Sequence, residues 1–213
     1  MRYASLIVNW NSADILPLTL KSVVEVFGAE RIFFWDNASE DDSVHIAKSC
    51  GVRVIPFARN VGFAGAVNRF LDMPESRYIK YLFIFNPDIV WYQGDLRRIL
   101  SFFESEVEEF LPSCEGSEEI FSLGGMLYYP EIHDSETADD RGNFYRFSPG
   151  RFQVGSRTFE FDGTYFRVKN IPEELHFLSK FPLMPTLFNT GGAMVVNLKI
   201  FRKLGGFDEV FFP

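Results

Sequence analysis

The sequence predicts an α/β fold with an open, mostly parallel sheet flanked by helices, followed by a smaller β-rich portion. Three observations carry this prediction. Short apolar runs alternate with amphipathic segments through the first half of the chain, as expected for successive strand–helix units. The run at residues 78–86 is apolar on both faces, which is typical of a central parallel strand. After residue 112 the pattern changes to polar loops and hairpin-like alternation.

In the first half, four apolar runs are predicted to be strands and the segments after them helices. The expected strands cover residues 3–9, 31–36, 52–57 and 78–86. The expected helices cover residues 13–27, 39–49, 60–71 and 93–110. Ser12 and Ser39 are N-cap candidates, and Pro17 falls in an early turn, where proline is tolerated. Gly28 and Gly51 are expected to end the first two helices.

The second half is predicted to contain mostly strands. They are expected at residues 120–129, in a hairpin over 150–168 with turns near Gly155 and Gly163, and at 187–196, before a short helix at 198–204. Residues 131–143 are acidic and poor in apolar side chains, so a mobile loop is expected there. No internal repeat or linker divides the chain, and we expect one domain over residues 1–213 with halves 1–111 and 112–213.

The overall charge argues against one class of partner. The 213 residues include 21 Lys and Arg against 29 Asp and Glu, a formal charge of −8. An acidic domain repels phosphate backbones, so nucleic-acid binding is not expected. A single nucleotide can still bind where local groups or a divalent cation offset its charge.

Cysteines and targeting segments indicate the compartment. Cys50 and Cys114 are the only cysteines and lack metal-ligand spacing, so free thiols in a reducing compartment are expected. The chain opens with no signal peptide, and no apolar stretch reaches the roughly 20 residues of a spanning helix. We therefore expect a soluble, cytoplasmic protein. Docking at the inner face of a membrane and the oligomeric state stay open.

Polar residues follow the apolar runs at four predicted strand ends. They are Asn9-Trp10-Asn11, Asp36-Asn37, Arg59-Asn60-Val61-Gly62 and Asn86-Pro87-Asp88. In open α/β sheets, ligands bind at the carboxyl ends of the strands, where the strand order reverses. Asp36 is suited either to accept the N3–H of a pyrimidine base or to cap the next helix. The four ends together predict a ligand site.

Two of these strand ends suit a phosphate ligand. Asn60 opens a helix with Gly62 and Gly65, whose small size allows a backbone to approach an anion such as a diphosphate. An N-cap with two packing glycines is the alternative. Pro87 fixes its own φ and extends the residue before it, so Asp88 is held at a defined place. A carboxylate there suits Mg²⁺ or Mn²⁺, while an ordinary Asn-Pro-Asp turn is the alternative.

Six segments share their order and spacing with a known family. They are ASLIVNWNS (4–12), FFWDNASEDDS (33–43), RNVGFAGAVNRF (59–70), FIFNPDI (83–89), NTGGAMVV (189–196) and LGGFDEVFFP (204–213). Together they resemble the family-two glycosyltransferases, and most closely their rhamnosyltransferase-like branch. The resemblance implies the GT-A fold and an inverting transfer of a sugar from a dTDP- or UDP-sugar. The implied acceptor is a glycan or lipid-linked, in polysaccharide or cell-surface glycan synthesis.

The resemblance also implies the site residues. The nucleotide-binding half, 1–111, would hold the nucleotide through Asn9, Asn11, Asp36, Asn37, Asn60, Gly62 and Asn86. Asp88 would hold Mg²⁺ or Mn²⁺. Asn86 stands where many relatives carry the first Asp of an Asp-x-Asp, which favours a lower metal affinity. The donor sugar and the acceptor would meet Gly191, Gly192, Ala193, Asp208 and Glu209.

The expected general base is the Asp of a Glu-Asp pair that follows the last segment in the family. The chain stops at Pro213 before such a pair, so we expect a piece of a longer protein with an incomplete acceptor-side half, 112–213. Asp208 is a candidate substitute base. A non-catalytic nucleotide-sugar-binding module is the alternative function.

Two other enzyme classes are disfavoured. A sugar-nucleotide-forming nucleotidyltransferase normally has a Gly-rich loop with Arg and Lys after the first strand, where this chain has Asn9-Trp10-Asn11-Ser12. A dinucleotide-binding dehydrogenase would need a Gly-x-Gly-x-x-Gly at the same place, and none follows the first strand.

Overall fold

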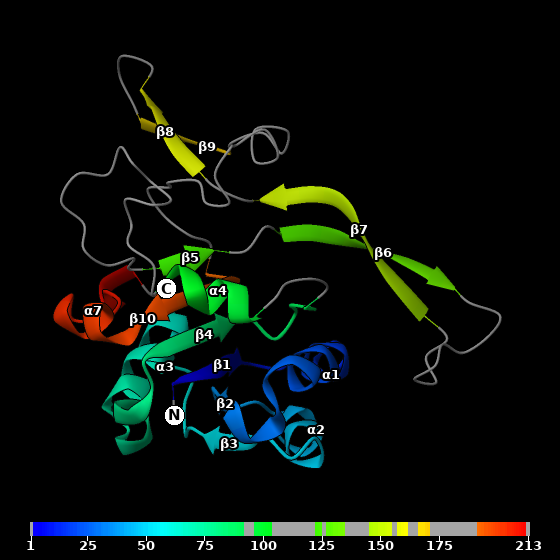
Figure 1. Ribbon diagram of the computed structural model, residues 1–213. Helices are drawn as coiled ribbons and strands as arrows, with labels where there is room; N and C mark the ends of the chain where they lie inside the picture. Colours follow the sequence, from blue (N-terminus) through cyan, green and yellow to red (C-terminus); the bar gives the residue numbers. More distant parts are fainter. Residues whose placement is uncertain are drawn as a thin grey trace. The chain divides into compact units, whose positions relative to one another are not determined.

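The protein is described by a computed structural model (Figure 1). The structure describes residues 2–91, 96–103, 122–124, 127–134, 145–154, 157–161, 166–170 and 191–211. Internal contacts divide the chain into two compact units. The first comprises Met1–Glu106, Ser117–Leu123 and Gly191–Pro213, and the second Val107–Gly116 and Gly124–Thr190.

The first unit is built on a six-stranded sheet in the order β3-β2-β1-β4-β10-β5. These strands are β1 (Tyr3–Asn9), β2 (Ile32–Asp36), β3 (Arg53–Pro56), β4 (Tyr81–Phe85), β5 (Ser122–Gly124) and β10 (Ala193–Asn197). Neighbouring strands are parallel from β3 to β4, and β10 runs antiparallel to β4. The prediction of an open, mostly parallel sheet is therefore confirmed.

Helices cover both faces of this sheet. Leu6 and Ile84 belong to a buried cluster that includes residues of α3 (Gly62–Asp72) and α7 (Leu198–Lys203). On the opposite face, Phe83 and Phe85 contact Phe27 of α1 (Leu16–Phe27), and α2 (Ser43–Ser49) lies beside α1 (Figure 1). Successive residues of a strand point to opposite faces of the sheet. A strand that is covered on both faces therefore needs apolar side chains almost throughout, as β1, β2 and β4 have.

The remaining helical segments of the first unit are short. They are α4 (Leu96–Phe102) and the 3₁₀ turns η1 (Ala29–Arg31), η2 (Pro74–Tyr78) and η3 (Glu209–Phe211). The predicted helix at 93–110 corresponds to α4 in the described residues, and that at 198–204 to α7. Among the described residues, no helix combines the length and the apolar character that crossing a bilayer requires.

Two predicted helix caps are wrong. The Ser12 hydroxyl donates to Asn9 Oδ1, and α1 begins only at Leu16. The Ser39 hydroxyl accepts from the side chain of Asn9 at 3.0 Å, and α2 begins at Ser43. Both serines therefore contact the end of β1 instead of a helix N-terminus. The predicted helix ends at Gly28 and Gly51 are confirmed, with φ of 77° and 74°.

The second unit contains two antiparallel strand pairs, as the β-rich pattern predicts. They are β6 (Leu127–Asp134) with β7 (Tyr145–Val154), and β8 (Arg157–Phe161) with β9 (Phe166–Asn170). The predicted loop at 131–143 is wrong for residues 131–134, which pair with β7, because main-chain pairing needs no apolar side chain. The hairpin predicted at 150–168 is formed by β8 and β9 alone. Residues 150–154 belong instead to β7, which pairs with β6. Residues 135–143, Gly155 and Gly163 lie outside the described residues.

Candidate functional site

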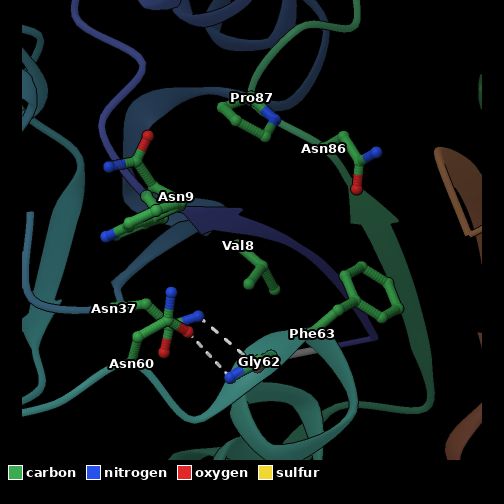
Figure 2. Close-up of a pocket in the computed structure, with 9 residues that line it drawn as sticks. Val8, Asn9, Asn37, Asn60, Gly62, Phe63, Asn86 and Pro87 are labelled. Carbon is green, nitrogen blue, oxygen red and sulfur yellow. Dashed lines mark hydrogen bonds between the residues drawn. The ribbon is translucent and has the colours of Figure 1, made fainter. Parts of the chain in front are cut away.

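A cleft of about 310 Å³ lies at the carboxyl ends of the strands in the first unit. It is lined by Val8, Asn9, Trp10, Asn37, Asn60, Gly62, Phe63, Asn86 and Pro87 (Figure 2). All four predicted strand ends contribute to this lining. The strand order reverses at β1, which has β2 on one side and β4 on the other, so the cleft has the position expected for a ligand in an open α/β sheet.

A buried hydrogen-bond network supports the β1 and β2 side of the cleft. Asn9 and Asp36 are opposite each other in the sheet, and Asn9 Nδ2 donates to Asp36 Oδ1 at 2.9 Å. The second carboxylate oxygen of Asp36 accepts from the Ser39 backbone N–H at 3.0 Å. Asp36 is 3% exposed and is not one of the lining residues. Its carboxylate therefore orients Asn9 and the loop that follows β2.

The loops after β1 and β2 are joined to each other. The Asn11 backbone N–H donates to Ser39 Oγ at 2.9 Å, and Asn11 Oδ1 accepts from the Glu40 N–H at 2.8 Å. Asn11 and Ala38 have φ of 47° and 60°, a conformation that costs a non-glycine residue about 1–2 kcal/mol. Asn11 thus contributes to the site by holding these loops together.

The start of α3 is held by two asparagine side chains. Asn37 Oδ1 accepts from Trp35 Nε1 at 3.1 Å, and Asn37 Nδ2 donates to the Gly62 carbonyl at 3.4 Å. Asn60 Oδ1 accepts from the Gly62 N–H at 2.9 Å, so it satisfies one of the unpaired donors at the helix start (Figure 2). Gly62 has φ of 72°, a conformation that favours glycine.

The metal-candidate residue Asp88 follows the lining residues Asn86 and Pro87. The Asn86 N–H donates to the Gly192 carbonyl at 3.0 Å, which joins the end of β4 to the segment before β10. Asp88 is exposed, and its carboxylate makes no hydrogen bond to any other described residue. A free carboxylate beside a cleft suits Mg²⁺ or Mn²⁺ when a ligand supplies phosphate oxygens. Within the described part of the chain, no three His, Cys, Asp or Glu form a closed metal site.

The predicted sugar-side residues are divided between the cleft edge and the sheet. A Cβ added at Gly191 would lie 3.7 Å from the Phe63 ring, so this glycine is next to the lining. The Gly192 carbonyl holds Asn86. Ala193 is buried within β10 opposite Phe85.

The predicted acceptor-side residues are held by α3. Glu209 accepts from Asn68 Nδ2 at 3.0 Å and from the Arg69 guanidinium at 3.2 Å. The hydrogen bond from Asn68, and then that from Arg69, lowers the pKa of Glu209 below its ordinary value. Asn68 also bonds both backbone groups of Phe207, at 2.8 and 2.9 Å. Asp208 is exposed, and its Oδ1 accepts from the Val210 N–H at 2.9 Å.

Four lining residues were not predicted as ligands: Val8, Trp10, Phe63 and Pro87. Trp10 is the most informative, because its indole is 57% exposed although large apolar side chains are usually buried. The available signal was an aromatic residue between two asparagines directly after a buried strand. Phe63 gave no such signal, since an aromatic side chain in the first turn of a helix usually belongs to the core.

Comparison with known proteins identifies the group that this chain resembles. The family described as Glycosyl transferase family 2 matches residues 6–123. Mannosyltransferase PcManGT from Pyrobaculum calidifontis, solved in complex with GDP-Man and Mn²⁺, is similar in structure, with a TM-score of 0.53 and 13% sequence identity over 98% of this chain and 48% of that chain. S. aureus TarS 1–349 in complex with UDP has a TM-score of 0.53 and 14% identity over 99% of this chain and 51% of that chain.

This chain spans about half the length of both solved structures. At such low identities the likeness establishes the fold. No curated protein sequence matches the chain.

Proposed function

Because the chain belongs to glycosyl transferase family 2 and has the GT-A fold, we propose that it binds a nucleoside diphosphate sugar and transfers the sugar to an acceptor hydroxyl with inversion. The cleft is the observation that carries this proposal. It combines an exposed aromatic ring with asparagine side chains from four strand ends at the reversal of the strand order.

The nucleobase binds at the β1 side of the cleft in this proposal. Trp10 presents an exposed indole face on which a base can stack. Each oxygen of Asp36 accepts one described hydrogen bond and retains a second lone pair. Asp36 accepts the N3–H of a pyrimidine through such a lone pair, after a small movement of the overlying loop. Asn9 and Asn11 hold this part of the site in place.

The diphosphate binds between the start of α3 and the end of β4. The N-terminus of α3, with Asn60 and Gly62, favours an anion because its first backbone N–H groups lack partners within the helix. Asp88, with Asn86 beside it, would hold Mg²⁺ or Mn²⁺, which would offset charge on the departing diphosphate. A single carboxylate binds such an ion weakly by itself, so metal and nucleotide should each strengthen the binding of the other.

The reaction is a single displacement at the anomeric carbon. The acceptor oxygen forms a bond to that carbon while the bond to the diphosphate oxygen breaks, and the diphosphate leaves with the electron pair. A carboxylate takes the acceptor proton. Asp208 is the candidate for this base, and Glu209 orients its segment through Asn68 and Arg69. An Asp208→Asn variant that transfers sugar as fast as the wild type would exclude Asp208.

The donor and acceptor are proposed from the sequence motifs. These motifs favour the rhamnosyltransferase-like branch and, with it, a dTDP- or UDP-sugar as the donor. The acceptor they favour is a glycan or a lipid-linked molecule in polysaccharide or cell-surface glycan synthesis. Gly191 and Gly192 contact the donor sugar in this proposal, and Gly191, which has no Cβ, lies beside the Phe63 ring of the cleft lining. Release of nucleotide from dTDP-rhamnose, UDP-GlcNAc and GDP-mannose distinguishes these donors.

Calorimetric titration of UDP, dTDP and GDP with and without Mn²⁺ tests the proposed function. The wild type should bind one pyrimidine diphosphate more tightly with Mn²⁺. Asp88→Ala should remove this gain, a loss of about tenfold or more, without altering the unfolding transition. Asp72→Ala is the matched control, since Asp72 is an exposed carboxylate at the opposite end of α3 from Gly62. Failure of every nucleotide to bind, or an unchanged gain in Asp88→Ala, would refute the proposal.

A further inference from the structure

Two hydroxyl groups of α1 bind the segment that carries Asp88. Thr19, which has no exposed surface, donates from Oγ1 to the Pro87 carbonyl at 2.6 Å, across 68 residues of sequence. Ser22, one turn further along α1, accepts from the Trp91 N–H at 2.9 Å. The Ser22 hydroxyl itself donates to the Thr19 carbonyl at 2.9 Å. A lone pair of its oxygen is therefore directed away from α1 and towards Trp91.

The bond from Thr19 restrains the backbone at which Asp88 begins. The Pro87 carbonyl and the Asp88 nitrogen belong to one planar peptide group, so fixing the carbonyl fixes the direction in which the chain enters Asp88. The ring of Pro87 fixes its φ, and the Asn86 N–H is bonded to Gly192. The backbone is thus restrained immediately before Asp88, while the Asp88 side chain itself stays exposed.

The far end of segment 86–91 is held by aromatic packing. The Trp91 ring lies 5.6 Å from the ring of Phe27 and 6.0 Å from that of Phe85, both in edge-to-face geometry. Such pairs add to the stabilisation that burial provides. The segment therefore has fixed points at Asn86, Pro87 and Trp91, and two of them depend on α1.

We propose that Thr19 and Ser22 are positioning residues, which restrain the backbone around Asp88 so that its carboxylate is placed where metal-dependent nucleotide binding requires it. This inference rests on the proposed function. A threonine within a helix usually bonds to a carbonyl of its own helix, whereas the buried hydroxyl of Thr19 donates to a carbonyl 68 residues away, directly before Asp88. A ligand group held in place before binding does not lose conformational freedom when the ligand arrives, and so binds more tightly.

Thr19→Val tests the proposal because valine has the shape of threonine without the hydroxyl. The measured quantity is the ratio of the UDP dissociation constants without and with Mn²⁺, by calorimetry. We expect Thr19→Val to lower this ratio about tenfold while leaving the affinity without Mn²⁺ unchanged. Thr19→Ser, which restores the hydroxyl, should return the ratio to the wild-type value. A purely structural role of Thr19 would lower the melting temperature and leave the ratio unchanged.

Ser22→Ala is the second variant, and it keeps the test decisive if Thr19→Val does not fold, because Ser22 is only partly buried. Its control is Ser49→Ala, which removes an exposed hydroxyl of α2 that donates to the Ile46 carbonyl at 2.7 Å. A lowered ratio in Ser22→Ala but not in Ser49→Ala supports the proposal. A wild-type ratio in both Thr19→Val and Ser22→Ala overturns it, while the Asp88 assignment stands. A wild type without any Mn²⁺-dependent gain refutes the proposed function itself, and this inference with it.

Discussion

Trp10 is a large aromatic side chain that is exposed beside the cleft. Its indole is 57% exposed at the edge of the cleft, whereas Trp35 at the neighbouring strand is 2% exposed and bonds to Asn37. Exposing a large aromatic surface forfeits the stabilisation that burial would provide, about 25 cal/mol per Å² of apolar surface. A side chain in this position is therefore better explained by contact with a ligand than by folding.

Trp10→Ala should weaken UDP binding by about 1–3 kcal/mol, the range for stacking of a base on an aromatic ring. The free energy of unfolding should change little, because the side chain is mostly exposed. Calorimetry and urea denaturation measure the two effects. Tyr78→Ala is the control, since Tyr78 is 74% exposed and does not line the cleft. Equal UDP affinities in Trp10→Ala and the wild type would remove the stacking role.

Among the elements, α3 connects the cleft to the chain segment after α7. Its first residues line the cleft, and Asn68 in its last turns bonds both backbone groups of Phe207. Gly205 and Gly206 lead into this contact with φ of 85° and 81°. A Cβ at Gly206 would lie 2.3 Å from Asn68 Oδ1, whereas a Cβ at Gly205 would meet nothing within 4 Å.

The two glycines allow a matched prediction. Gly205→Ala should cost about 1–2 kcal/mol of unfolding free energy, because an L-residue is strained at positive φ. Gly206→Ala should cost at least about 1 kcal/mol more, because Asn68 must move and release Phe207. Urea denaturation measures both values. In an Asn68→Ala background the difference between the two substitutions should vanish, and a persistent difference would contradict this account of the contact.

Elements buried on both faces were predictable from the sequence, and long-range partners were not. The strands β1, β2 and β4 begin and end within three residues of their predicted bounds, because burial of both faces leaves a continuous apolar pattern. The caps at Ser12 and Ser39 were wrong because both serines bond to Asn9, which for Ser39 lies 30 residues away. The pairing of Asn9 with Asp36 likewise depends on the register of two strands, which no local pattern reveals.

At the scale of the molecule, the described lining of the cleft comes entirely from the first unit. The strands β5 and β10 flank residues 125–190, the longer part of the second unit, in the sequence, and they are neighbours in the sheet. Adjacent strands lie about 5 Å apart, so a short link can join them. The first unit therefore contains the nucleotide site that we propose, together with a sheet that is covered on both faces.

Replacing residues 125–190 by a short glycine linker should leave a protein that unfolds cooperatively and binds UDP with wild-type affinity. Urea denaturation and calorimetry measure these properties. The expected loss is confined to transfer to the acceptor, because the second unit belongs to the acceptor-side half in the proposed function. Loss of UDP binding in a variant that still folds would mean that residues of the second unit complete the donor site.

The amide-rich lining of the cleft has a consequence for the pH dependence of ligand binding. None of the nine lining residues has an ionisable side chain, and four of them are asparagine. An amide neither gains nor loses a proton across the pH range in which enzymes operate, so the hydrogen-bonding groups and the charge of this lining do not change with pH. Any pH optimum of activity would therefore report on the ligand's own phosphates, on Asp36 as the proposed ligand of the base, on the metal ligand, or on the group that accepts the acceptor's proton.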